Sequence, residues 1–144
     1  MSKVQIRGVD HLYLSVTDPT RSLVFYDRLM AFLGLEKLKR RMTVALAAYE
    51  SRAARFTLYL APAERGRAPV DRRAPGLHHL SFEVGSRQEV DLVYRELLAM
   101  EAEILDPPAD YPHYREQFYA VYFADPDGIK LEIAFRSWED ANEP

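Results

Sequence analysis

Cysteine is absent from this 144-residue chain, and no apolar run approaches the length of a membrane-spanning helix. The absence of cysteine excludes disulfides, thiolate metal ligands and thiol catalysis, and it is typical of a reducing compartment. The stretch from Met1 to Arg7 also lacks the apolar core of a signal peptide. These absences predict a cytoplasmic protein without a membrane partner.

An excess of positive charge is also missing, since 19 Lys and Arg stand against 22 Asp and Glu, a net charge of −3. Basic residues are scattered and form no basic face for a phosphate backbone, so we expect no nucleic-acid partner. Residues 62–76 are locally rich in arginine and proline. We interpret them as a solvated linker, with attraction of an anionic substrate as the alternative.

What the chain does contain is an internal repeat. Gly8–Val16 aligns without a gap to Gly76–Val84, at an offset of 68 that pairs His11 with His79. Residues 56–61 align to 129–134 at an offset of 73, which pairs Tyr59 with Glu132. The pattern indicates a duplicated supersecondary unit.

Hydrophobic residues make up 48% of the chain, enough to bury the core of one compact domain. We expect residues 1–144 to form a single domain with a first unit at about 8–61 and a second at about 77–135. Residues 62–76 are the expected linker, and 136–144 an acidic tail.

Each unit is predicted to contain a strand, a helix and three further strands. In the first unit Val9–Val16 alternates as a strand does, Asp18 and Pro19 open a helix, and Gly34 ends it. Residues 42–49 read as helix or strand, and the repeat favours strand. The prediction is an α+β fold: two tandem βαβββ units whose curved mixed sheets surround a metal-binding cleft, with the helices outside.

The second unit repeats this plan. A strand is expected at Leu77–Val84, and Ser86 to Glu89 is a capping box opening a helix. The inward positions of that helix are predicted to be Val90, Val93, Tyr94, Leu97 and Leu98. A short strand at residues 103–105 should precede a long loop, residues 106–116, whose composition suggests a lid.

Glu132 is the residue around which a site is predicted. The turn at residues 125–128 precedes a strand whose apolar positions alternate with Glu132, and a carboxylate among apolar neighbours needs a positive partner. His11 and His79 occupy equivalent repeat positions, so the three residues are candidate ligands for one divalent metal: Fe(II), Mn(II), Zn(II) or Ni(II). Strand parity predicts that His78 faces away from His79. A structural histidine is the alternative for either ligand taken singly.

These motifs resemble the vicinal oxygen chelate superfamily of glyoxalases, bleomycin-resistance proteins and extradiol dioxygenases, over residues 9–135. The resemblance implies a metal-dependent enzyme whose small substrate chelates the metal through vicinal oxygens. From His113 to Glu132 the spacing is similar to the signature of extradiol dioxygenases, which implies catalytic roles for His113 and Tyr122 on the substrate oxygens. The alternative for His113 is an exposed loop residue without a catalytic role, and the alternative for Tyr122 is an aromatic residue packed on a strand. Tyr111 departs from the small or β-branched residue expected there, and no suitable second loop histidine precedes His79.

Other activities of the superfamily stay open. Tyr59 stands where glyoxalase I carries a carboxylate, and a phenol is a poor general base at neutral pH. Isomerase and thiol-transferase chemistry are nevertheless alternatives to dioxygenation. A non-catalytic small-molecule binder is the contrasting class, and Tyr13, Tyr59 and Tyr111 are the candidate substrate-binding residues. A homodimer with two sites is expected, each site lying within one chain or shared between two.

Overall fold

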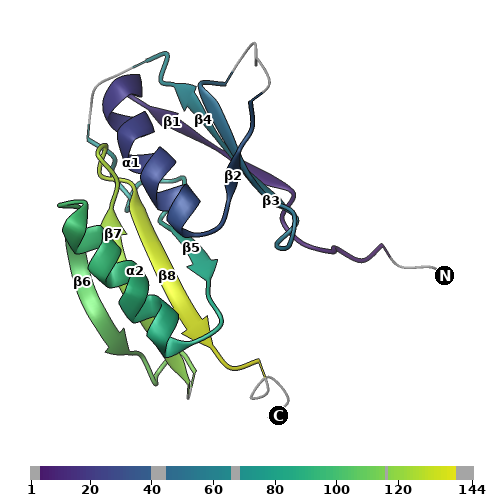
Figure 1. The fold of residues 1–144 in the computed structure, drawn as a ribbon, viewed down its shortest axis with the longest axis vertical. Helices are drawn as coiled ribbons and strands as arrows, with labels where there is room; N and C mark the ends of the chain where they lie inside the picture. The colour runs from purple at the N-terminus through teal and green to yellow at the C-terminus, as the bar shows by residue number, and fades with distance from the viewer. Residues whose placement is uncertain (1–3, 40–44, 66–68, 116, 139–144) are drawn as a thin grey trace. The chain divides into compact units, whose positions relative to one another are not determined.

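The computed structural model describes residues 4–39, 45–65, 69–115 and 117–138 (Figure 1). The chain divides into two compact units, Met1–Arg67 and Ala68–Pro144. Each contains one helix and one four-stranded mixed sheet. This architecture confirms the predicted α+β fold of two βαβββ units.

The first unit contains β1 (His11–Val16), α1 (Pro19–Phe32), β2 (Glu36–Lys37), β3 (Ala47–Ser51) and β4 (Phe56–Pro62). Its sheet has the order β1-β4-β3-β2, with β1 parallel to β4 and the other pairs antiparallel. The strand at residues 47–51 bears out the strand reading of that region. Residues 42–44, which the same prediction covered, lie outside the described residues.

The second unit contains β5 (Leu80–Glu83), α2 (Arg87–Ala99), β6 (Glu103–Asp110), β7 (Phe118–Ala124) and β8 (Lys130–Arg136). Its strand order, β5-β8-β7-β6, repeats that of the first sheet. The registers also correspond, since Tyr13 pairs with Tyr59 in β1–β4 and Ser81 pairs with Glu132 in β5–β8. The offsets of 68 and 73 relate Tyr13 to Ser81 and Tyr59 to Glu132, so residues that are equivalent in the sequence repeat also occupy equivalent positions in the two sheets.

Both helices begin at the predicted caps. Asp18 accepts a hydrogen bond from the Arg21 backbone N–H at 3.1 Å, and Ser86 accepts one from the Glu89 N–H at 3.2 Å. Glu89 in turn accepts from the Gly85 N–H at 2.6 Å. Each cap satisfies N–H groups that have no partner within the helix.

Each helix buries one face. The buried residues of α2 are Val90, Val93 and Leu97, whereas Leu98 is 50% exposed. The prediction that Leu98 points inward was therefore wrong, because the buried stripe of this helix is narrower than its apolar sequence suggests.

Two strand boundaries differ from the sequence prediction. β5 begins at Leu80, so His79 precedes the strand. β6 continues to Asp110, so residues 106–110, predicted as part of a lid, are strand instead. The prolines at 107 and 108 are tolerated because β6 is an edge strand and its pairing with β7 shifts register between Asp106 and Ala109.

The turn between β7 and β8 holds Glu132 in place. Buried Asp125 accepts hydrogen bonds through Oδ1 from the backbone N–H groups of Asp127, at 2.9 Å, and Ile129, at 2.8 Å. Gly128 has a φ of 84°, a conformation that favours glycine. The hairpin therefore has a fixed register, which pairs Glu132 with Tyr122.

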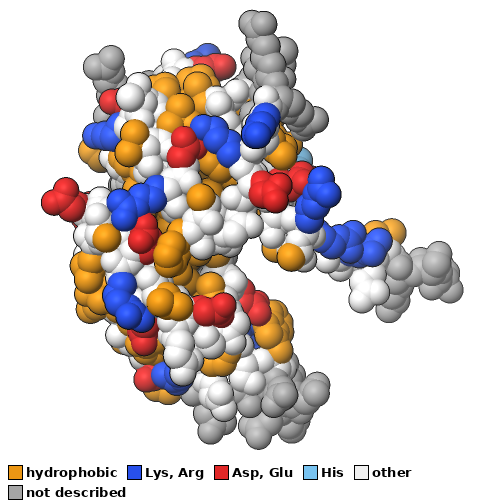
Figure 2. Space-filling model, viewed as in Figure 1, with side chains coloured by type: hydrophobic (Ala, Val, Ile, Leu, Met, Phe, Trp, Pro, Cys, Tyr) orange, Lys and Arg blue, Asp and Glu red, His pale blue; other side chains and the backbone are white. Residues whose placement is uncertain are grey.

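Acidic and basic side chains are interspersed on the face of the described residues drawn in Figure 2. No continuous basic surface is visible on that face. Among the described residues, no helix is both long and apolar enough to span a membrane.

Candidate metal centre

Tyr122 and Glu132, the predicted strand residues of the second unit, lie on the sheet face opposite α2. Tyr119 marks the helix side, because its hydroxyl donates to Asp91 of α2 at 2.7 Å. Side chains alternate along a strand, so Tyr122 on β7 and its partner Glu132 on β8 point to the other side. Glu132 is only 3% exposed, which makes it one of few buried charged residues described.

Glu132 lies next to His79. Its Oε2 is 3.1 Å from His79 Nε2, while its Oε1 is buried and has no hydrogen-bond partner among the described residues. A buried carboxylate oxygen without a partner is costly, and a divalent cation would compensate it. An imidazole nitrogen and a carboxylate oxygen are suitable ligands for the four metals predicted, so these residues fit such an ion.

His78 contradicts the parity prediction. Its Nδ1 lies 2.7 Å from Nδ1 of His79, and the two rings meet edge-on. Strand parity does not apply here because both residues precede β5. The contact involves Nδ1 of His79 and leaves Nε2 directed at Glu132.

The aromatic candidates of this unit form a chain of ring contacts leading away from His79. The ring of Tyr122 lies 5.9 Å from His79 and 5.6 Å from Tyr111, and Tyr111 lies 6.0 Å from His113. Tyr122 is buried, whereas His113 is exposed on the connection between β6 and β7. Burial, followed by the negative charge of Glu132, raises the pKa of the Tyr122 phenol above its usual value of 10. This phenol is therefore a hydrogen-bond donor at neutral pH, not a base.

The first unit contains the other three candidates, His11, Tyr13 and Tyr59. The two tyrosine rings are stacked at 4.5 Å, and both meet the His11 ring edge-on, at 5.8 and 5.7 Å. His11 Nδ1 lies 2.7 Å from Asp10 Oδ2. Because an ionised carboxylate only accepts hydrogen bonds, Nδ1 is the donor of this contact, and Nε2 is the ring nitrogen that does not contact Asp10.

The structure thus brings the predicted residues together in two sets, one in each unit. Within the described residues of either unit, no group of three His, Asp or Glu side chains is arranged to hold a metal ion. Joint ligation by His11, His79 and Glu132 stays a prediction. Sequence reasoning missed Asp10, although its position directly before a candidate ligand was a usable signal.

Two βαβββ units with mixed four-stranded sheets are the architecture expected of the vicinal oxygen chelate superfamily. The sequence model of the Glyoxalase/Bleomycin resistance protein/Dioxygenase superfamily matches residues 8–133, and the chain belongs to this superfamily.

Individual proteins are similar to this chain over most of its length. Virulence protein STM3117 of Salmonella typhimurium is 23% identical over 129 residues, which are 90% of this chain and 84% of that protein. The crystal structure of a glyoxylase/bleomycin resistance protein/dioxygenase domain from Frankia sp. EAN1pec has 26% identity and a TM-score of 0.73, covering 92% of this chain and 100% of that one. A mutant of the fosfomycin resistance protein FosX from Listeria monocytogenes, complexed with Mn(II) and 1S,2S-dihydroxypropylphosphonic acid, has 16% identity and a TM-score of 0.70, covering 97% and 100%.

Proposed function

We propose that the protein is a divalent-metal-dependent enzyme acting on a small substrate that chelates the metal through vicinal oxygens. The observation that supports this proposal is buried Glu132, with one oxygen next to His79 and the other without a hydrogen-bond partner among the described residues. His11, His79 and Glu132 are the proposed ligands. A divalent ion held there supplies Lewis-acid polarisation of the substrate oxygens.

Extradiol-type dioxygenation of a catechol is the specific reaction we propose. Tyr122 carries its proton at neutral pH and is close to His79, so its hydroxyl would donate a hydrogen bond to a substrate oxygen. His113, reached from Tyr122 through Tyr111, would hold or move a proton at the second oxygen. Tyr13, Tyr59 and Tyr111 would pack against the substrate ring and exclude water.

Oxygen uptake tests this reaction. After anaerobic reconstitution with Fe(II), the parent protein should consume oxygen with a member of a catechol panel. Tyr122→Phe and His113→Ala should each lower kcat by about a hundredfold, since general acid–base groups typically contribute at least that much. Glu132→Gln should abolish uptake, and Glu103→Gln, an exposed carboxylate of the same unit, is the matched control.

Two results would exclude dioxygenation. One is the absence of uptake with every catechol in protein that is fully loaded with Fe(II). The other is unchanged turnover in both Tyr122→Phe and His113→Ala. Either result would direct attention to isomerase or thiol-transferase chemistry, which needs no oxygen.

A non-catalytic binder is the second candidate, because stacked Tyr13 and Tyr59 provide a flat aromatic surface of the kind that holds planar ligands. Metal content separates the two candidates. A binder of this kind would be isolated without stoichiometric metal and would bind its ligand equally well after chelator treatment.

A further inference from the structure

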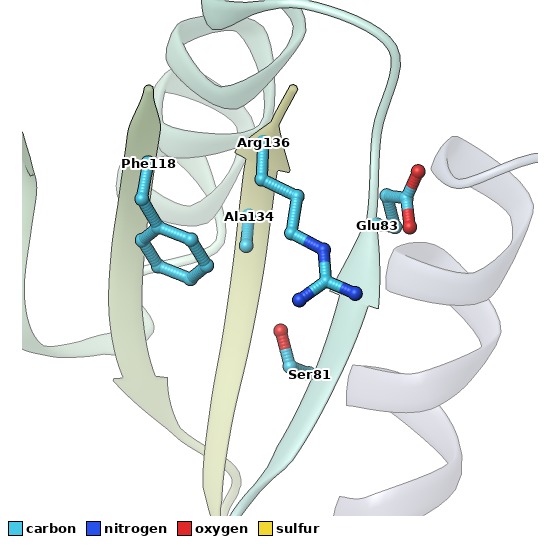
Figure 3. A pocket seen from close by; sticks show the side chains of 5 residues that line it. All are labelled: Ser81, Glu83, Phe118, Ala134 and Arg136. Atoms are coloured by element: carbon cyan, nitrogen blue, oxygen red, sulfur yellow. The ribbon is translucent and has the colours of Figure 1, made fainter. Parts of the chain in front are cut away.

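A pocket of about 240 Å³ lies within the second unit. Its walls come from β5, β7 and β8, and it is lined by Ser81, Glu83, Phe118, Ala134 and Arg136 (Figure 3). Ser81 is the ladder partner of Glu132, and Ala134 and Arg136 follow Glu132 at intervals of two residues along β8. Because alternate residues share a face, the pocket continues the surface that carries Glu132.

Arg136 provides the positive charge of this pocket. Figure 3 shows its guanidinium extending from β8 toward Ser81 on β5. The guanidinium stacks on the Trp138 ring with its central carbon 3.5 Å from the ring centroid, and no carboxylate of the described residues forms an ion pair with it. Stacking uses the flat face of the group and leaves its N–H edge available to an acceptor.

The remaining walls suit an organic anion better than a bare inorganic one. Phe118 and Ala134 are apolar, and Ser81 adds one hydroxyl. A guanidinium edge matches the two oxygens of a carboxylate or phosphonate, and the apolar wall suits the carbon skeleton attached to it.

We propose that this pocket is the subsite for an anionic group, a carboxylate or phosphonate, carried by the substrate. The inference rests on the proposed function, which places the vicinal oxygens of the same substrate near Glu132. Four strand residues from Glu132 to Arg136 span about 13 Å, and the Arg136 side chain leans back toward Ser81, the partner of Glu132. The anionic group is therefore joined to the oxygen-bearing part by a short tether.

Glu83 opposes a second negative charge in the same pocket. Its Oε1 accepts a hydrogen bond from the Trp138 indole N–H at 2.9 Å, which orients the carboxylate without neutralising it. The pocket should therefore bind a singly charged group, a carboxylate or the monoanion of a phosphonate, and removal of the Glu83 charge should strengthen anion binding.

Calorimetric titration of chelator-treated, full-length protein tests the subsite, because without metal an anion can bind only to groups of the chain. The probes are benzoate, phenylphosphonate and uncharged benzamide. We expect benzoate or phenylphosphonate to bind at least about tenfold more tightly than benzamide, which corresponds to 1.4 kcal/mol. Whichever anion binds more tightly identifies the class of group.

Three variants locate the effect. Arg136→Gln should remove the preference for the anion, Arg136→Lys should keep part of it, and Glu83→Gln should raise anion affinity. Thermal unfolding shows whether each variant is folded. If Arg136→Gln fails to fold, the two conservative changes, Arg136→Lys and Glu83→Gln, test the subsite in its place.

Equal binding of benzoate and benzamide would overturn the proposal, and so would parent-like anion affinity in all three variants. Glu132→Gln separates this outcome from failure of the proposed function. That variant should lose metal binding while still binding the anionic probe.

Discussion

Asp10 and His78 occupy equivalent repeat positions, and each contacts Nδ1 of the histidine that follows it. Asp10 Oδ2 lies 2.7 Å from His11 Nδ1, and His78 Nδ1 lies 2.7 Å from His79 Nδ1. In both units the contact involves Nδ1 of the candidate ligand and does not involve its Nε2. Partners that fix the tautomer and orientation of a ligating imidazole increase its affinity for metal.

Asp10→Asn tests this positioning role. Loss of the negative charge weakens the hold on the Nδ1 proton, so metal affinity should fall by about tenfold without loss of stoichiometry. Competition titration with a chromogenic chelator measures the change. Glu36→Gln, an exposed carboxylate on β2, should match the parent, and an unchanged affinity in Asp10→Asn would show that Asp10 does not position His11.

Individual residues of the candidate site were predictable where the repeat made them equivalent. Glu132 could be placed because alternation with apolar neighbours indicates which face of a strand a residue occupies. His78 could not, since parity assumes a strand, and the side chains that precede β5 follow no such rule. Arg136 was not recognised because a lone arginine near the end of a strand is ordinary in sequence.

At the scale of elements, Tyr119 joins β7 to α2. Its hydrogen bond to Asp91, followed by partial burial, raises the pKa of the phenol from 10 to about 12. The folded state therefore holds this proton more tightly than the unfolded state does. The resulting stabilisation is fully present below pH 10 and is lost as the pH rises from about 10 to about 12.

Replacement of Tyr119 by Phe should remove that contribution. The variant should be less stable than the parent at pH 8, and the difference should shrink as the pH rises above 10. Urea unfolding at a series of pH values measures this difference, and comparison with the parent cancels the titration of the other tyrosines. A difference that stays constant from pH 8 to 11 would contradict the assignment.

Helix ends were more predictable than strand ends. Asp18 and Ser86 are local signals, since a cap depends on residues three positions away. The extent of β6 depends on its place at the sheet edge, where an irregular ladder tolerates Pro107 and Pro108. A single sequence does not show which strand lies at the edge of the sheet, and so residues 106–110 were expected to be loop.

At the scale of the whole molecule, the proposed ligands come from both units. His11 belongs to the first, and His79 and Glu132 belong to the second. We propose a homodimer in which each site lies within one chain or is shared between two. In an exchanged dimer the first unit of one chain would serve the second unit of the other.

Mixing two inactive variants tests that alternative. His11→Ala and Glu132→Ala chains, combined after partial unfolding, can form one complete site only if units exchange. Recovery of metal binding in verified heterodimers, at about half the parent's stoichiometry, would support a shared site. No recovery would place each site within a single chain.

The most direct test of the account is the metal stoichiometry of His11→Ala, since this residue is the one metal ligand proposed from the first unit. Calorimetric titration with Mn(II) should give one site per chain in the parent. In His11→Ala, as in His79→Ala and Glu132→Ala, stoichiometric binding should be lost, while Glu103→Gln keeps it. Parent-like Mn(II) binding by His11→Ala would contradict the claim that the two repeats supply ligands to one metal.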